Sequence, residues 1–179
     1  TRKKHCNKNS KISMHQIHQP KIKDFEKIVS LMNEADKKFL EVLTPENAKE
    51  IGVSDFNISD LTDNNHLLLA IYEDNEPVGI ALYHFKTPKV IWINSLYIHP
   101  KKQRQGFGKK LMLAIEKEAK IKGVTAIVLE TEKNANWAVN FYNKLDYIIL
   151  TKEDFQKEPF LNILSKDPVQ NRFIFAKKI

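Results

Sequence analysis

The sequence predicts a layered α/β domain of the α+β kind, built on a mixed and mostly antiparallel sheet. Some segments repeat apolar residues at helical spacing, while others are short apolar or alternating runs of strand length. The predicted strands follow one another through short turns in the middle of the chain and are separated by helices later on. The chain has 179 residues, 42% of them hydrophobic, which suits one globular domain with a substantial core.

Residues 1–11 are expected to form a solvated basic tail, leaving residues 12–179 as a single domain. The tail is polar, rich in lysine and arginine, and not followed by an apolar run, so it lacks the form of a signal peptide. It contains Cys6, the only cysteine, which excludes a disulfide framework within the chain and favours a reducing, cytoplasmic location. No apolar run reaches the roughly 18 residues of a membrane span, so no membrane association is predicted.

The first half of the chain is expected to contain a strand, helices and a β-hairpin. A weakly alternating stretch predicts a strand over residues 12–17. Helical spacing of apolar residues predicts an amphipathic helix over 21–33, with further helix through Leu43. Thr44 and Pro45 have the form of an N-cap and the first residue of a short helix. Three strands are then predicted, with an acidic turn between the first two, at residues 67–72, 78–85 and 90–98.

The second half is expected to alternate helices and strands. A helix after Gly108 should end at Gly123, and its apolar face is formed by Leu111, Ala114, Ile115 and Ala119. β-Branched residues predict a buried strand over 124–130. The remaining expected elements are a helix over 136–145 and closing strands at 147–150 and 172–176.

The turn between the strand at 90–98 and the next helix is the strongest candidate for a ligand site. It reads Gln103-Arg104-Gln105-Gly106-Phe107-Gly108. Glycine lets a ligand approach the backbone, and the first turn of a helix offers unpartnered N–H groups with partial positive charge. These features favour a phosphate or pyrophosphate, with added attraction from Arg104, Lys109 and Lys110. The spacing fits neither a P-loop nor a dinucleotide fingerprint, because Gln103 and Leu111 stand where small residues are required.

The stretch from Leu96 to Leu111 resembles the GNAT family of N-acetyltransferases. An apolar strand ends in His99-Pro100 and is followed by the family pattern Gln/Arg-x-x-Gly-x-Gly/Ala, here residues 103–108. A second stretch, from Asn134 through Ala138 to Phe141-Tyr142, resembles the family's Asn, then Ala-x-x-Phe-Tyr pattern. The resemblance covers about residues 64–150. It implies a GNAT-like acyl-CoA N-acyltransferase fold, with helices on both faces of the sheet and a splayed central pair of strands.

The resemblance implies an enzyme that moves an acetyl group from acetyl-CoA, its cosubstrate, directly to a primary amine of a small molecule or peptide. Tyr142 matches the family's general acid, and Glu130, at the end of a strand beside the cleft, is a candidate catalytic base. The pantetheine arm is expected to bond to the backbone of Leu96 and Ile98. The expected coenzyme-binding residues are Leu96, Tyr97, Ile98, Gln103, Arg104, Gln105, Gly106, Phe107, Gly108, Lys109, Asn134, Asn136 and Phe141.

Three positions depart from the family pattern. Asp146 replaces the usual glycine before the last aromatic residue, although aspartate tolerates a left-handed backbone. Ala135 stands in place of the usual asparagine, with Asn134 or Asn136 as substitutes. Asn94 stands where many members carry a carboxylate on the central strand.

Because of Asn94, the general base is open between Glu130, His84 and a relay of water molecules. The missing carboxylate also leaves a non-catalytic acyl-CoA-binding sensor of the same fold as an alternative. Trp137 either packs in the core or shapes the cleft.

A basic nucleic-acid-binding protein is the alternative from another class, since the net charge is +7. However, no aromatic residues are interleaved with the basic ones, and no recognition helix or zinc site is recognisable. No nucleic acid is therefore expected as a partner. No metal is expected either, because no His, Asp and Glu spacing resembles a ligand set. A homodimer is allowed, since dimers are common among related proteins.

Overall fold

A computed structural model of the protein describes residues 15–43, 56–62, 66–151, 153–154 and 171–179. The predicted basic tail and the short helix predicted after Thr44 lie outside the described residues. So do the first three residues of the strand predicted over 12–17, and the described part of that strand, β1, spans His15–His18.

The described strands form one seven-stranded sheet. After β1 they are β2 (Leu67–Glu73), β3 (Glu76–Thr87), β4 (Val90–Ile98), β5 (Ala126–Glu132), β6 (Ile148–Ile149) and β7 (Arg172–Lys178). Their order is β1-β2-β3-β4-β5-β7-β6, and every neighbouring pair is antiparallel except β4 and β5. The mixed, mostly antiparallel sheet is therefore confirmed. The place of β7 between β5 and β6 is a long-range pairing that no local pattern in the sequence indicates.

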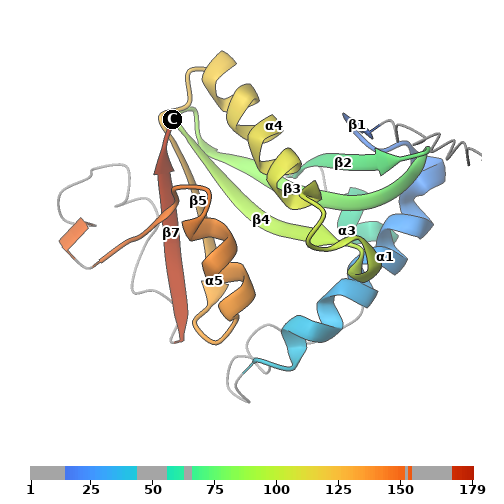
Figure 1. Ribbon diagram of the computed structural model, residues 1–179. Helices are drawn as coiled ribbons and strands as arrows, with labels where there is room; N and C mark the ends of the chain where they lie inside the picture. Colours follow the sequence, from blue (N-terminus) through green and yellow to red (C-terminus); the bar gives the residue numbers. More distant parts are fainter. Residues whose placement is uncertain (1–14, 44–55, 63–65, 152, 155–170) are drawn as a thin grey trace, which may run out of the picture.

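Helices cover both faces of the sheet (Figure 1). The described helical segments are the 3-10 turn η1 (Ile22–Asp24), α1 (Phe25–Leu40), α3 (Ile58–Thr62), the 3-10 turn η2 (Pro100–Lys102), α4 (Phe107–Ile121) and α5 (Asn136–Asn143). The helix predicted over 21–33 begins later, after η1, and the further helix expected beyond it is the continuation of α1. None of the described helices is long and apolar enough to cross a membrane.

Two apolar clusters hold the helices against the sheet. On one face, Ile28 and Met32 of α1 pack on β2 and β3. On the other, Met112 and Ile115 of α4 pack together with Tyr142 of α5. The strand residues of this second cluster come from β3, β4, β5 and β7, and include Ile93, Leu129 and Phe175. It therefore joins the two parts of the sheet on either side of the β4–β5 pair.

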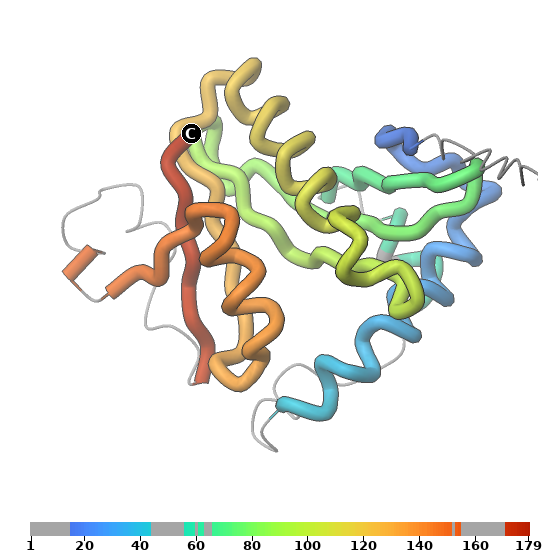
Figure 2. The backbone as a smooth tube through the Cα atoms, viewed as in Figure 1, coloured from blue at the N-terminus to red at the C-terminus, as the bar shows by residue number. Residues whose placement is uncertain are grey.

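β4 and β5 run side by side for only part of their length and then diverge (Figure 2). Their pairing runs from Val90 with Ala126 to Ile93 with Leu129 and goes no further. The next residue, Asn94, is an extra residue in the pairing of β4 with β3. A bulge of this kind bends its strand and increases the twist, which directs the rest of β4 away from β5. The splayed pair of central strands is thus present, and its bend lies at Asn94.

Candidate functional site

The turn before α4 has the left-handed backbone that its glycine pattern favours. Gly106 directly precedes α4 with a φ of 85°, and a Cβ atom there would meet nothing within 4 Å. The conformation rather than crowding therefore requires glycine. Arg104 also has a positive φ, 64°, which is strained for a residue with a side chain. At Gly108 a Cβ atom would lie 3.2 Å from Cζ of Phe141, so the absent side chain lets α5 approach α4.

The backbone N–H groups of residues 104–109 have no hydrogen-bond acceptor among the described residues. The first amide of α4 with a partner is that of Lys110, which donates to the Gly106 carbonyl at 3.0 Å. The Gln105 side chain does not cap the helix, because its amide donates to the Lys101 carbonyl. Unpartnered N–H groups at the positive end of a helix dipole form an anion-binding site. The turn can therefore hold a phosphate-sized anion by its backbone.

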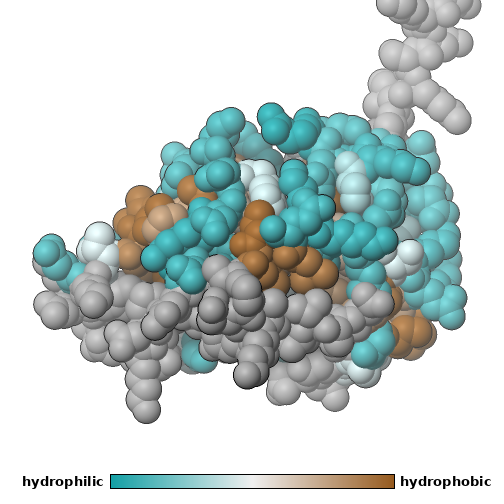
Figure 3. All heavy atoms as spheres, turned by 90° about the horizontal axis from the view of Figure 1, so that it is seen from below, coloured by the Kyte–Doolittle hydropathy of each residue, from teal (hydrophilic) through white to brown (hydrophobic). Residues whose placement is uncertain are grey.

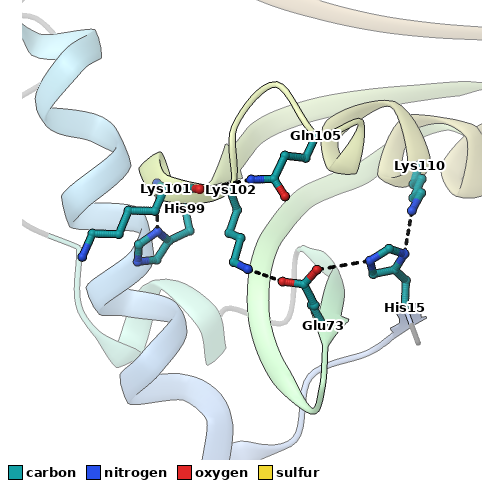
Figure 4. Close-up of polar contacts among 7 residues, drawn as sticks. All are labelled: His15, Glu73, His99, Lys101, Lys102, Gln105 and Lys110. Atoms are coloured by element: carbon teal, nitrogen blue, oxygen red, sulfur yellow. Dashed lines mark hydrogen bonds and ion pairs between the residues drawn. The ribbon is translucent and has the colours of Figure 1, made fainter. Parts of the chain in front are cut away.

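Two lysines beside this turn are held by partners on β1 and β2 (Figure 4). Lys102 donates to one oxygen of Glu73, whose other oxygen lies 3.4 Å from Nε2 of His15. Nδ1 of His15 lies 2.7 Å from Nζ of Lys110. Glu73 thus offsets part of the positive charge near the turn. The exposed cations that form no ion pair with the described residues include Arg104 and Lys109.

A cavity of about 500 Å³ opens between α1, β4, β5 and α5, where β4 has left β5. On the face shown in Figure 3, apolar surface gathers near the middle and is bordered by hydrophilic side chains. The cavity wall has the same mixture, with Phe39, Trp92, Trp137, Tyr142, Lys38, Asn94, Glu130 and Arg172 among its residues. Apolar walls with a few placed polar groups are typical of small-molecule sites.

The far half of β4 presents a backbone edge that no described strand covers. His99 N donates to the Val78 carbonyl on β3 at 2.9 Å. Because hydrogen bonds alternate along an antiparallel pair, the backbone groups of Ile98 and Leu96 point away from β3, to the side that β5 has left. The Ile98 carbonyl accepts from the side-chain amide of Gln103 at 3.3 Å. An extended ligand could therefore bond to this edge as a strand would.

Tyr142 lies on α5 and lines the cavity, with 8% of its surface exposed. Its ring packs against Phe141, Tyr147 and Phe175. Its hydroxyl has no hydrogen-bond partner among the described residues. Every side-chain polar atom of these residues that is sealed from solvent does have a partner. Burial raises the pKa of Tyr142, so the phenol keeps its proton at neutral pH.

Glu130 lines the same cavity and is bound to an arginine. Arg172 donates from Nη1 to Glu130 at 3.2 Å and from Nε to Glu132 at 2.8 Å. Glu132 is only 1% exposed, so Arg172 is the counter-ion of a buried carboxylate as well as a contact of Glu130. Burial lowers the pKa of Arg172, but its hydrogen bonds and charge interactions with the two carboxylates outweigh burial and raise it overall. The guanidinium is therefore a fixed positive charge between two carboxylates.

Asn94 and His84, which are separate candidates in the sequence, meet in the structure. Nδ1 of His84 donates to the side-chain oxygen of Asn94 at 2.7 Å. The hairpin of β3 and β4 brings them together, and the bulge residue Asn94 lines the cavity. The ring of His84 also meets His66 edge to face, with centroids 5.6 Å apart. An imidazole thus bonds to the side chain of Asn94, the position at which the resemblance leads to the expectation of a carboxylate.

The other predicted coenzyme-binding residues have different surroundings. Tyr97 reaches toward α1, where its hydroxyl donates to Asp36 at 3.0 Å. Phe107 is buried in the core. Asn134 and Asn136 are exposed and do not line the cavity, whereas the intervening Ala135 is buried at the start of α5. The predicted site residues that line one cavity are therefore Leu96, Tyr97, Ile98, Gln103, Glu130 and Tyr142. The anion-binding turn follows directly after β4.

Lys38 and Arg172 are cavity residues that the sequence does not single out. Nζ of Lys38 lies 4.5 Å from the ring centroid of Trp137, so this contact joins α1 to α5. No motif links residues so far apart. Arg172 stands opposite Glu132 in the antiparallel register of β5 and β7, where opposite charges attract, but this register is a long-range pairing that the sequence does not indicate. Within the described ranges, no group of three or more His, Cys, Asp or Glu residues is arranged to hold a metal ion.

Comparison with known proteins gives the class to which this architecture belongs. Residues 28–147 match the family model described as the acetyltransferase (GNAT) family. The match covers more than half of the chain, so the chain belongs to the GNAT acetyltransferase family. Asp146 has the left-handed backbone, with a φ of 63°, that the missing family glycine would otherwise supply.

Solved structures agree on the fold. PaiA N-acetyltransferase from Thermoplasma acidophilum, in complex with coenzyme A, is 18% identical with a TM-score of 0.72, covering 93% of this chain and 99% of its own. The ribosomal-protein-S18-alanine N-acetyltransferase from Escherichia coli is 15% identical with a TM-score of 0.65, covering 93% and 94%. The putative acetyltransferase yncA from Salmonella typhimurium, with acetyl-CoA, is 14% identical with a TM-score of 0.64, covering 92% and 93%. No protein of curated function matches the sequence.

Proposed function

We propose that this protein is an N-acetyltransferase that moves an acetyl group from acetyl-CoA directly to a primary amine of a small molecule or peptide. The observation that carries the proposal is the run of N–H groups at residues 104–109 that have no acceptor in the described part of the chain. The turn lies beside the far half of β4, whose edge no described strand covers, and beside the cavity. Family membership and the coenzyme-bound neighbours support an acyl-CoA substrate. The amines of small molecules and peptides have the size that the cavity can admit.

The chain's own groups fit the coenzyme in three places. The amides of residues 104–109 suit its pyrophosphate, with Arg104 and Lys109 nearby. The backbone of Leu96 and Ile98 suits the amide groups of its pantetheine arm. Tyr142 and the cavity lie beside β4 beyond its last pairing with β5. Bound there, the coenzyme supplies an activated acetyl thioester.

The protein groups around the cavity suit direct acetyl transfer. The N–H of Ile98 points to the cavity side and can donate to an oxyanion that forms at the acetyl carbonyl. The Tyr142 hydroxyl is protonated and has no partner within the described part of the chain, so it can give a proton to the departing sulfur. Glu130 and the His84–Asn94 pair are two routes by which the proton of the amine could leave.

The test is a thiol-release assay with acetyl-CoA against a panel of primary amines, paired with thermal unfolding in the presence of coenzyme A. We expect coenzyme A to raise the melting temperature, because a ligand that binds only the folded state stabilises it by mass action. We also expect thiol release with at least one amine class. Glu130→Gln, compared with a His84→Gln variant, identifies the proton route. A coenzyme that causes no stabilisation would contradict the proposal at its first step.

A second candidate function is acyl-CoA sensing without catalysis. Two observations favour it, namely Asn94 in place of the family's carboxylate and the engagement of Glu130 by Arg172. A sensor would bind coenzyme A and acetyl-CoA, with clear thermal stabilisation, yet release no thiol with any amine. Stabilisation with thiol release excludes the sensor, and stabilisation without it supports the sensor.

A further inference from the structure

The cavity contains a primary amine that belongs to the protein itself. Lys38 lines the cavity that Tyr142 and Ile98 also line, and its ammonium group lies 4.5 Å from the ring centroid of Trp137. Trp137 is itself 38% exposed and makes up part of the cavity wall rather than the core. The contact is a cation–π interaction, which is favourable but weak at an exposed site. The ammonium is therefore at the cavity without being fixed by an ion pair among the described residues.

The neighbouring lysine on the same helix gives a natural comparison. Lys37 lines a different groove, between α1 and α3, together with Asn33 and Ile58. Both lysines are exposed. They have the same chemistry and adjacent positions but face different parts of the molecule. A reaction directed by the cavity should therefore distinguish between them.

We propose that Lys38 is an autoacetylation site, modified in cis by the protein's own acetyl-transfer site. This inference rests on the proposed function. The neutral Nζ attacks the acetyl carbonyl carbon, a C–N bond forms, and the C–S bond breaks. The sulfur leaves as coenzyme A thiol with a proton from Tyr142, and the nitrogen gives up a proton to water. The flexible four-carbon stem of lysine lets Nζ leave Trp137 while α1 stays in place.

Acetylation of Lys38 would change the charge of the cavity lining. Arg172 and its two carboxylates carry one negative charge together, and Lys38 adds a positive charge to the lining of the same cavity. The amide product carries no charge and loses its attraction to the Trp137 ring. The modified protein therefore presents a more negative cavity with an uncovered tryptophan, which favours a cationic amine acceptor.

The experiment incubates the full chain with acetyl-CoA in the absence of any added amine and follows it by intact mass and peptide mapping. We expect one acetyl group on Lys38, gained at least about tenfold faster than on Lys37, because a group held in the cavity reacts at a high effective concentration. The rate should be first order and independent of protein concentration. Lys38→Arg should remove this fast phase, whereas the matched Lys37→Arg variant should keep it. Tyr142→Phe should slow Lys38 without changing Lys37.

A second measurement does not depend on catalysis. Coenzyme A itself should slow the labelling of Lys38 by an amine-reactive ester while leaving Lys37 unchanged. Equal acetylation of the two lysines, or a rate that rises with protein concentration, overturns the proposal. Thiol release with free amines and an unmodified Lys38 also overturns it, but leaves the proposed function intact. If neither free amines nor Lys38 are acetylated while coenzyme A binds, the proposed function fails as well.

Discussion

At the scale of single residues, the Tyr142 hydroxyl is distinguished by having no partner among the described residues. We expect Tyr142→Phe to lower kcat by about 10²-fold or more, since positioned acids contribute about 10²–10⁴-fold. The free energy of unfolding should hardly change, because no hydrogen bond is lost. Steady-state kinetics and urea denaturation measure the two effects.

Tyr83→Phe is the matched control for that variant. The Tyr83 hydroxyl donates to Glu118 at 2.5 Å, outside the cavity. Its removal should cost about 1–2 kcal/mol of stability and leave kcat unchanged, because a hydrogen bond to a charged group is lost. A fall in kcat of less than twofold in Tyr142→Phe would defeat the role given to that residue.

The pairing of Arg172 with two carboxylates leads to a different expectation. Arg172→Met would remove from Glu132, which is 1% exposed, the guanidinium that donates to it at 2.8 Å. Breaking such a pair by removing one partner costs about 3–5 kcal/mol. Urea denaturation at neutral pH should show this loss. The additional change Glu132→Gln should restore part of it, and a double variant no more stable than Arg172→Met would contradict the explanation.

At the scale of elements, the two ends of α4 allow a direct comparison. Gly106 precedes the helix with a φ of 85°, and Gly123 follows it with a φ of 66°. Alanine at either position should cost about 1–2 kcal/mol, because the left-handed backbone is unfavourable for residues with a Cβ atom. Only Gly106→Ala should also weaken coenzyme A binding, by about tenfold in Kd, since only it shapes the anion-binding turn. Isothermal titration calorimetry and thermal unfolding separate the effects, and equal Kd values in the two variants would contradict this reading.

The same elements show which structural features could be predicted from the sequence. The turn at residues 103–108 and the boundaries of β4 were predictable, because glycine spacing and apolar runs are local properties. The left-handed Asp146 was predictable for the same reason. The contact of Lys38 with Trp137 was not, because it depends on how α1 and α5 are placed by the core between them. The bulge at Asn94 could not be predicted either, since asparagine suits a strand end or a turn equally well.

At the scale of the whole molecule, the tyrosines set the response to alkaline pH. Burial is the largest cause that raises the pKa of each of the five tyrosines, and nearby carboxylates raise it further in four of them, namely Tyr72, Tyr83, Tyr97 and Tyr147. The folded chain thus keeps protons that the unfolded chain releases above its ordinary pKa of 10.0. The resulting stabilisation is complete below pH 10 and is lost as the pH rises further.

We therefore expect the free energy of unfolding to fall steeply above pH 10, with tyrosinate absorbance appearing together with unfolding. Urea denaturation and ultraviolet absorbance at several alkaline pH values measure both. The loss of one phenol in Tyr142→Phe should make the decline shallower. Phenolate absorbance that appears in the folded protein near pH 10 would contradict the expectation. For catalysis, the activity should show no decline below pH 10 from loss of the Tyr142 proton.

The short pairing of β4 with β5 has a mechanical consequence. In the described residues β4 and β5 pair only over Val90–Ile93 and Ala126–Leu129, so this pairing and the apolar cluster beneath α4 join two lobes of the sheet. We expect the short pairing to act as a hinge between these lobes. A molecule lodged along β4 and against α5 would touch both lobes and restrain the hinge. Hydrogen–deuterium exchange should then slow at residues 94–98 and in α5 when coenzyme A is added, while the β1–β2 region stays as it was. Uniform slowing over the whole chain would mean that the lobes do not move independently.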